Sequence, residues 1–397
     1  MEDVLTAPHL DVKIGNSSVR LLGTAHVSQS SIDAVTEAIS SGDFDHVAIE
    51  LCQNRYHSMT DPDNFERTNL IEVLWQGKAK MVVAMLAMGA FQQRIAEQLG
   101  VEPGGEMRAA IAEARTAGIP LELVDRDIGI TVQRIYGSVP WWKRPNLFLG
   151  LLGSVLSTSK VEESEIEALK RTDMLQAAME EFQESAGSIF EPLITERDLY
   201  MACKIKSIVG TEPCKLLAVV GAGHVTGMSQ LLRGDQELSE RVIASLEERP
   251  RPAQFGKYIP WIIVLIICAG FGVGFSRSTE LGISLVVDWV LINGGLSSLG
   301  VLIAGGHPLT IASAFLAAPL TSLNPTIGAG MVVAIVEAWI RKPTIHDFRL
   351  VRKDVVTVKG WRKNKVARTL LVFVLGTLGS AVGTYVAGFR IFGQLVG

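Results

Sequence analysis

Two copies of a Gly-x-x-His pattern supply the residues best suited to chemistry in this sequence. They are Gly23-Thr24-Ala25-His26 and Gly221-Ala222-Gly223-His224. Each copy directly follows a run of apolar residues that is typical of a buried strand. The glycine allows close approach of the backbone, and a neutral imidazole at a strand end can bind a divalent metal ion, accept a proton from water or cap a helix.

Two further apolar runs end in charged residues. Glu50 closes the run that begins at Asp45 and is followed by Arg55, and the run from Ile119 leads into Arg126. Glu50 is a candidate general base or carboxylate ligand. Arg55 or Arg126 is the candidate group for stabilising an oxyanion or holding a substrate carboxylate. The alternative for Glu50 and Arg55 is an ordinary ion pair at the solvent edge.

The elements that would position these residues alternate between strands and helices. We expect a hairpin over 10–23, helices over 30–40, 106–117 and 191–209, and strands over 45–51, 119–125 and 216–223. This order predicts an α/β domain with a largely parallel or mixed central sheet. Because ligands in such sheets bind at the carboxyl ends of the strands, these side chains should share one edge. His26, His224 and Glu50 would then form the ligand set that leaves a divalent metal ion one open position for water.

The density of charged residues divides the chain near residue 250. Between residues 258 and 340 the charged residues are Arg277, Glu280, Asp288 and Glu337, whereas residues 1–250 carry charges throughout. We therefore predict a soluble domain over 1–250 and a helical membrane domain over 251–397, with a lipid bilayer as partner. A net charge of −4 argues against binding to nucleic acid. The four scattered cysteines form neither a disulfide framework nor a metal-binding Cys-x-x-Cys pair.

Hydropathy predicts a multi-pass cell-membrane protein. The predicted spans are 258–275, 281–305 and 369–392, and residues 308–340 are too long for one straight span and hold Pro319 and Pro325 near their centre. We expect a helical hairpin there. Residues 341–368 hold ten Lys or Arg and should be cytoplasmic. If the hairpin enters and leaves the membrane on the same side, the soluble domain is cytoplasmic too. The lack of a recognisable signal peptide favours this arrangement. If residues 308–340 cross the membrane once, the soluble domain lies outside.

Taken together, four motifs resemble the TraB/PrgY family, which is related to GumN and the TIKI proteases. They are GTAHVS at 23–28, IELCQNRY at 49–56, DRDI at 125–128 and GAGHV at 221–225. The resemblance spans the soluble half in order and spacing, and a multi-span C-terminal region is typical of the prokaryotic members. It implies a fold like that of EreA, ChaN and TIKI proteins. It also implies that His26 and His224 are the family's histidines, Glu50 its glutamate, and Arg55 or Arg126 its arginine.

The expected function follows from the residues and the resemblance together. Some relatives are divalent-metal-dependent proteases and others are named for shutting down peptide pheromones. We therefore expect a membrane-anchored hydrolase that cleaves a peptide and depends on manganese, cobalt or zinc. One alternative is a non-catalytic regulator that binds a peptide pheromone. Another is a transporter or channel, in which intramembrane groups such as Asp288 and Glu337 line a polar path and the soluble domain acts as a gate.

Overall fold

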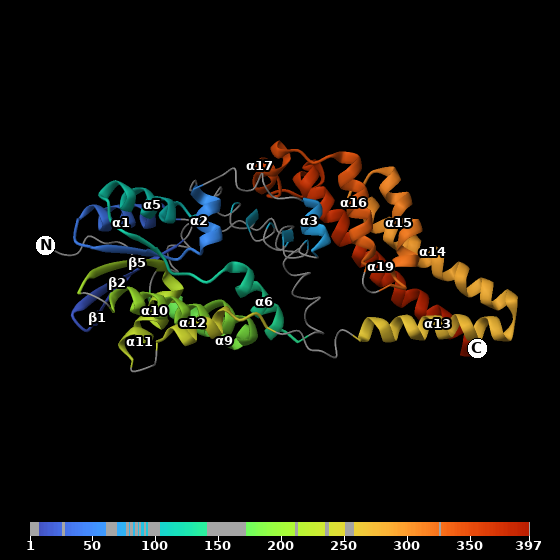
Figure 1. The fold of residues 1–397 in the computed structure, drawn as a ribbon, viewed down its shortest axis with the longest axis horizontal. Coiled ribbons are helices and arrows are strands. Elements are labelled where there is room, and N and C mark those ends of the chain that lie inside the picture. The colour runs from blue at the N-terminus through green and yellow to red at the C-terminus, as the bar shows by residue number, and fades with distance from the viewer. Residues whose placement is uncertain are drawn as a thin grey trace. The chain divides into compact units, whose positions relative to one another are not determined.

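The chain forms two compact units, which are described separately. The computed structural model describes residues 8–25, 28–60, 70–76, single positions between 79 and 93, 104–140, 172–210, 213–234, 238–250, 258–324 and 327–396 (Figure 1). The first unit comprises residues 1–62, 91–150 and 157–250, and the second comprises 63–90, 151–156 and 251–397.

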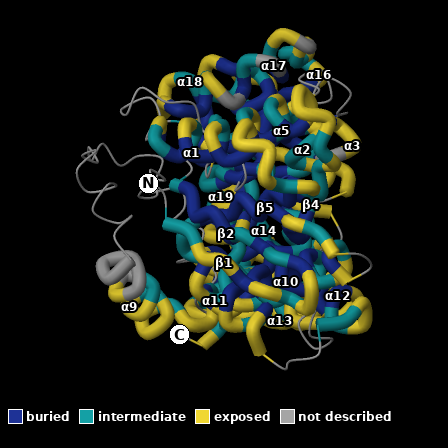
Figure 2. Tube along the Cα trace, turned by 90° about the vertical axis from the view of Figure 1, so that its left-hand side faces the viewer, coloured by how far each residue is buried: buried dark blue, intermediate teal, exposed yellow. Residues whose placement is uncertain are grey.

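A five-stranded mixed sheet forms the centre of the first unit, as predicted. Strands β1 (His9–Ile14) and β2 (Ser17–Thr24) form the expected antiparallel hairpin. Strands β3 (His46–Ile49), β4 (Leu121–Leu123) and β5 (Lys215–Gly221) run parallel to β2, and the spatial order is β1-β2-β5-β3-β4. The last strand in the chain thus enters the middle of the sheet. Figure 2 shows β2 and β5 as largely buried.

Helices cover both faces of this sheet. Helices α1 (Gln29–Ser40) and α5 (Gly105–Ala117) pack on one face, and α10 (Glu196–Val209) and α11 (Ala222–Arg233) on the other (Figure 1). The side chains of β5 divide accordingly. Leu217 and Val219 join the α1 and α5 cluster, whereas Leu216, Ala218 and Val220 join the α10 and α11 cluster. This alternation explains the continuous apolar sequence of β5, because both faces of a central parallel strand are buried.

Shorter elements complete the first unit. They are α2 (Gln53–Thr60), α6 (Ile128–Ser138), α9 (Thr172–Phe190), the π-helical turn η2 (Glu191–Thr195) and α12 (Glu240–Glu247). Helix α10 begins where η2 ends, so the predicted helix over 191–209 is continuous in position but π-helical in its first turn.

Three long apolar helices dominate the second unit. Helices α13 (Ile259–Arg277), α14 (Thr279–Ile303) and α19 (Lys365–Val396) are each long and apolar enough to cross a membrane. Many of their large apolar side chains face outward, among them Leu265 at 69% and Phe389 at 77% exposure. Such surfaces suit contact with lipid rather than water.

Two short helices occupy the region for which a hairpin was expected. They are α15 (Pro308–Thr321) and α16 (Ala329–Arg341), with 14 and 13 residues, so each extends only about 20 Å at 1.5 Å per residue. Ser322, directly after α15, donates a hydrogen bond to Asn293 Oδ1 at 3.2 Å. Asn293 lies near the middle of α14, so α15 ends beside the middle of that long helix.

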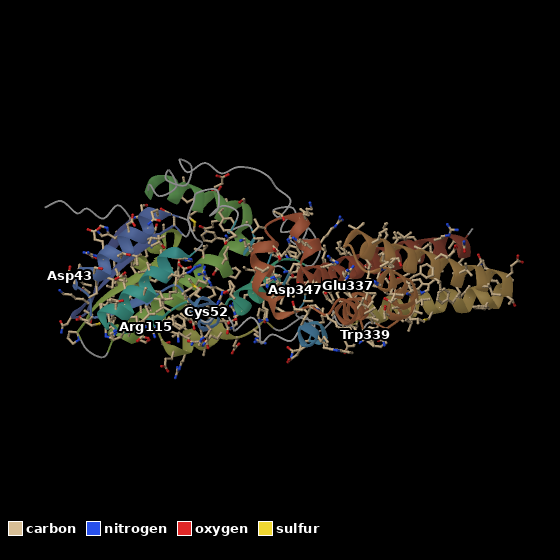
Figure 3. The ribbon with its side chains drawn as sticks, turned by 90° about the horizontal axis from the view of Figure 1, so that it is seen from above. Asp43, Cys52, Arg115, Glu337, Trp339 and Asp347 are labelled. Carbon is tan, nitrogen blue, oxygen red and sulfur yellow. The ribbon has the colours of Figure 1, made fainter. Side chains whose placement is uncertain are left out.

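The polar side chains of the second unit are engaged with one another. Glu337 is fully buried and accepts hydrogen bonds from Thr310 Oγ1 at 2.6 Å and from the His307 main chain at 2.9 Å. It thereby joins the start of α15 to α16, whose other side carries the exposed Trp339 (Figure 3). Asp288 pairs with Arg390 at 2.7 Å. The short helices α3 (Leu70–Trp75), α17 (Ile345–Asp354) and α18 (Val358–Lys363) complete the unit.

Candidate functional site

Parallel strands bring the candidate residues to one edge of the sheet. Thr24 at the end of β2 lies beside Gly221 at the end of β5, and Ile49 of β3 pairs with Val219 of β5. Glu50, Asp125 and His224 follow the ends of β3, β4 and β5, respectively. Two of the predicted residues, Glu50 and His224, are therefore brought together, and both are buried.

A guanidinium group from α10 lies at the centre of this edge. Arg197 binds Asp125 through two hydrogen bonds, from Nε to Oδ1 at 2.9 Å and from Nη2 to Oδ2 at 3.0 Å. The same Nη2 also donates to Glu50 Oε1. Glu50 Oε2 accepts a further hydrogen bond from the Gly221 main chain at 2.6 Å. Arg197 therefore links the ends of β3 and β4, and Glu50 links them to β5.

His224 is oriented by a second residue of the same helix. Its Nδ1 lies 2.5 Å from Asp198 Oδ1. A carboxylate in this position accepts the Nδ1 proton and leaves the lone pair of a neutral imidazole on Nε2. Nε2 lies 3.1 Å from Arg197 Nη1 and 3.5 Å from Glu50 Oε1. The lone pair of His224 is thus directed toward the ion-pair cluster.

Burial and neighbouring charges have opposite effects on the pKa values of Arg197 and Asp198. Burial alone would lower the pKa of Arg197, but the charges of Asp125 and Glu50 raise it well above its ordinary value. The guanidinium is therefore permanently charged. Burial raises the pKa of Asp198, although the hydrogen bond from His224 and the charge of Arg197 partly oppose that effect. Among the described residues, three carboxyl groups, those of Glu50, Asp125 and Asp198, lie around one guanidinium, and such a set of oxygen atoms would suit a further cation.

Residues 9–268 match the TraB/PrgY/gumN family, and residues 255–396 match the C-terminal domain of the TraB family protein. This chain belongs to the TraB/PrgY/gumN family. Every residue of the cluster lies within the part that matches the family.

Relatives from distant organisms share this similarity. An uncharacterised protein of Methanocaldococcus jannaschii is 31% identical over an alignment of 397 positions, which covers 97% of this chain and 96% of that protein. A TraB domain-containing protein of Bos taurus is 31% identical over 297 residues, covering 68% of this chain and 76% of that protein. The human TraB domain-containing protein is 29% identical over 248 residues, covering 56% of this chain and 65% of that protein. The archaeal relative therefore extends over both units.

Arg126, one of the two predicted arginines of this TraB/PrgY/gumN chain, donates its main-chain N–H to Asp125 of the cluster at 2.8 Å, but its guanidinium binds other groups. Arg126 is completely buried; its Nη1 binds Glu196 at 2.7 Å and its Nη2 binds the Pro192 carbonyl at 2.8 Å. Arg134 binds the same Glu196. Burial would raise the pKa of Glu196, but hydrogen bonds from Arg134 and Arg126 lower it. Arg126 thus ties the strand end to η2 and α10. Arg55 is half-buried on α2, and substrate binding by either arginine stays a prediction.

Residue patterns at the strand ends did not predict Arg197 and Asp198, because both lie on helix α10. A signal existed in the spacing. Arg197, Met201 and Ile205 are four residues apart and buried on one side of α10. A charged residue on an otherwise apolar helical stripe has to find a partner of opposite charge in the interior.

The predicted metal ion can be tested against the chemistry of these donors. The 3.5 Å between His224 Nε2 and Glu50 Oε1 suits two ligands that each lie about 2.1 Å from one tetrahedral ion. A carboxylate behind a metal-binding histidine, as Asp198 is placed, is also typical. However, Arg197 Nη1 uses the single lone pair of Nε2. The predicted third ligand, His26, lies outside the described residues, among which no three His, Cys, Asp or Glu side chains form a metal-binding group. The described residues therefore fit two of the three ligands, once Arg197 releases Nε2.

Proposed function

We propose that this TraB/PrgY/gumN protein is a membrane-anchored hydrolase that cleaves peptide bonds at the edge where Glu50, Arg197 and His224 meet. The observation that supports the proposal is the arrangement of Asp198, His224 and Glu50, which directs a basic imidazole nitrogen toward a carboxylate in a buried, charged cluster. Clusters of buried groups with opposing effects on each other's ionisation are typical of catalytic sites.

Each residue has a distinct role in this proposal. Without a metal ion, Asp198 fixes the Nδ1 proton of His224, and Nε2, once Arg197 Nη1 releases it, can accept a proton from an attacking water. Glu50 holds that water, and Arg197 holds Glu50 and Asp125 in position beside it. If a divalent ion such as manganese, cobalt or zinc were held by His26, His224 and Glu50, it would occupy Nε2 in place of that proton and would itself supply an activated water at neutral pH.

We propose further that α13, α14 and α19 cross the cell membrane and that α15 and α16 enter and leave it on one side. Each of these two short helices extends about 20 Å, whereas the hydrocarbon core is about 30 Å thick. The basic segment 341–368 should remain in the cytoplasm. Two crossings, by α13 and α14, separate the first unit from the hairpin, so the first unit would face the cytoplasm as well.

The decisive experiment measures peptide cleavage by the purified full chain in detergent, with manganese, cobalt or zinc added. Glu50→Gln and His224→Ala should each reduce the rate at least 100-fold, since general-base catalysis contributes about 10²–10⁴-fold. His46→Ala is the matched control, because His46 opens β3 at the opposite end of the strand. The hydrolase proposal fails if the wild-type chain cleaves no peptide or if both site variants cleave as the wild type does. Peptide binding without cleavage would instead support the regulator.

A further inference from the structure

The outer edge of the sheet lies beside the candidate site. Strand β4 is the terminal strand of the described sheet and pairs only with β3. Val47 donates its main-chain N–H to Pro120, and Val124 donates to Ile49. Main-chain groups alternate in direction along a strand, so residues 120, 122 and 124 face β3. Leu121 and Leu123 therefore present their N–H and C=O groups on the outer edge.

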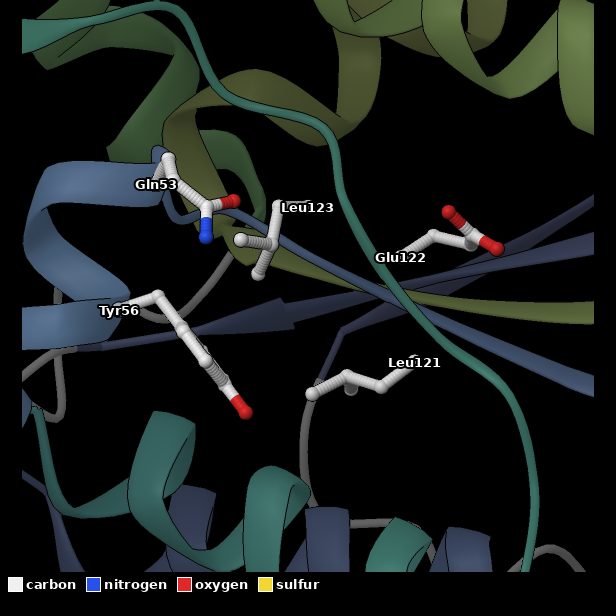
Figure 4. A pocket seen from close by; sticks show the side chains of 5 residues that line it. All are labelled: Gln53, Tyr56, Leu121, Glu122 and Leu123. Atoms are coloured by element: carbon white, nitrogen blue, oxygen red, sulfur yellow. The ribbon is translucent and has the colours of Figure 1, made fainter. Parts of the chain in front are cut away.

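A groove borders this edge. It is a hollow of about 400 Å³ lined by Gln53 and Tyr56 of α2 and by Leu121, Glu122 and Leu123 of β4. In Figure 4 the side chains of Gln53, Tyr56, Leu121 and Leu123 surround one space, and Glu122 extends away on the other face of the strand. The outward main-chain groups and this groove together match the shape of an extended chain.

The charge of the edge specifies the occupant. Glu122 is the charged residue among those described residues that line the groove. Its carboxylate forms no ion pair with another described residue. Residues that lie opposite one another on adjacent strands share a face of the sheet and pair by charge. A strand added to β4 would thus place a cationic side chain beside Glu122. Its two neighbours would turn to the opposite face, toward Leu121, Leu123 and the polar ends of Gln53 and Tyr56.

We propose that the substrate peptide binds as an added sixth strand along β4, with a Lys or Arg opposite Glu122 and small apolar residues on either side. Backbone hydrogen bonds to Leu121 and Leu123 supply affinity, and the pairing with Glu122 supplies selectivity. The cleavage part of this inference rests on the proposed function, whereas the binding part does not.

The topology also sets where the bond to be cleaved lies. Leu123 precedes Asp125 by two residues and Gln53 follows Glu50 by three, so the groove opens at the catalytic edge. The added strand would lie three strand spacings, or about 14 Å, from β5 and its His224, a distance that about four extended residues cover. The cleaved bond should therefore lie about four residues beyond the segment paired with β4.

Binding is tested with a fluorescein-labelled ten-residue peptide that carries one Val-Lys-Val segment, by fluorescence anisotropy on the full chain in detergent. Leu123→Pro removes one outward N–H, and edge positions tolerate proline because that N–H does not serve the sheet. Leu123→Ala keeps the N–H and loses the same side chain. Loss of one hydrogen bond should weaken binding about fivefold in the proline variant relative to the alanine variant. Equal affinities for the two variants would overturn strand addition.

Two further measurements keep the test independent of how these variants fold. Methylating the peptide amides one at a time should weaken binding at alternate positions only, whereas uniform tolerance or uniform weakening would contradict a paired strand. Glu122→Lys should reverse the preference from a Val-Lys-Val to a Val-Glu-Val peptide, and an unchanged preference would remove the pairing claim. Glu50→Gln should bind the peptide as the wild type does but not cleave it. If Glu50→Gln binds and still cleaves, the proposed catalysis is wrong while strand addition stands.

Discussion

At the scale of single residues, the candidate site depends on one guanidinium held by two carboxylates. The strand-end rule predicted from the sequence that Glu50 and His224 lie at one edge, because residues that follow parallel strands reach the same edge of the sheet. It could not predict that Arg197 would lie between them. The partner of a buried charge is set by how helix α10 crosses the sheet, and that packing is not encoded in local spacing.

Replacing Arg197 should therefore be costly and strongly coupled to Glu50. Arg197→Met leaves the buried carboxylates of Glu50 and Asp125 without their counter-charge, which should destabilise the fold by about 3–5 kcal/mol. Adding Glu50→Gln removes one of those charges, so the double variant should be more stable than the sum of the two single changes by about 1–3 kcal/mol. Denaturant unfolding of the four proteins measures the coupling. Strict additivity would mean that the ion pair is absent.

The buried carboxyl group of Asp198 should make the stability of the fold depend on pH. Burial raises its pKa above the ordinary value of 3.8, so the native state holds that proton at pH values where the unfolded chain has lost it. This stability is fully present below pH 3.8 and is lost as the pH rises through the raised pKa. Asp198→Asn cannot ionise and still accepts the Nδ1–H of His224, so it should melt at a higher temperature than the wild type at pH 8 and lose that advantage as the pH falls.

The control for this experiment is Asp43→Asn, since Asp43 is exposed on the surface (Figure 3). It should shift the melting temperature little at any pH between 5 and 8. The Asp198 prediction is wrong if Asp198→Asn melts below the wild type at pH 8. In the proposed mechanism the same variant loses activity, because an amide does not stabilise the imidazolium that forms on proton transfer.

At the scale of elements, periodicity predicted which segments form helices and strands but not how they are ordered. The hairpin β1–β2 could be read from its turn, because its partners are adjacent in sequence. The insertion of β5 between β2 and β3 could not, since uniformly apolar strands carry little information about their neighbours. The helices of the second unit show another limit. Their long apolar sequences predict spans, yet which sides of α14 and α19 meet depends on glycines whose role is visible only in the packing.

Gly379 and Gly388 on α19 give a matched test of that packing. A Cβ on Gly379 would collide with the main chain of α14 at Leu296, whereas a Cβ on Gly388 would meet open space. Gly379→Ala should therefore destabilise the bundle by about 1–3 kcal/mol through overpacking. Gly388→Ala should be neutral or stabilising by up to about 1 kcal/mol, because alanine favours helix. Thermal unfolding in detergent separates them, and identical behaviour of the two variants would show that α14 and α19 do not pack in this way.

At the scale of the whole molecule, the division of charge along the sequence predicted two regions of different solvent, and the structure has two compact units. The sequence left open whether residues 308–340 cross the membrane once or enter and leave it on the same side. Two helices of about 20 Å each, the first of which ends beside the middle of α14, favour the return. In the proposed topology Ser322 would lie within the membrane, where non-helical backbone is tolerated only if protein surrounds it, and its hydroxyl is hydrogen-bonded to Asn293 and Ser380.

This topology predicts on which side of the membrane a reporter protein lies when it is fused at each of three positions. With a returning hairpin, a reporter ahead of residue 9 and one inserted after Val356, between α17 and α18, should both be cytoplasmic, and one after Val396 should lie outside. With a single crossing, the basic segment and the C-terminal end would still lie on opposite sides, but the first reporter would share the side of the last. The first reporter is therefore the informative one. Fusing a phosphatase that is active only outside the cell to each position reads the answer directly. Activity at both ends and none after Val356 would show that residues 308–340 cross the membrane, and would move the candidate site to the cell exterior.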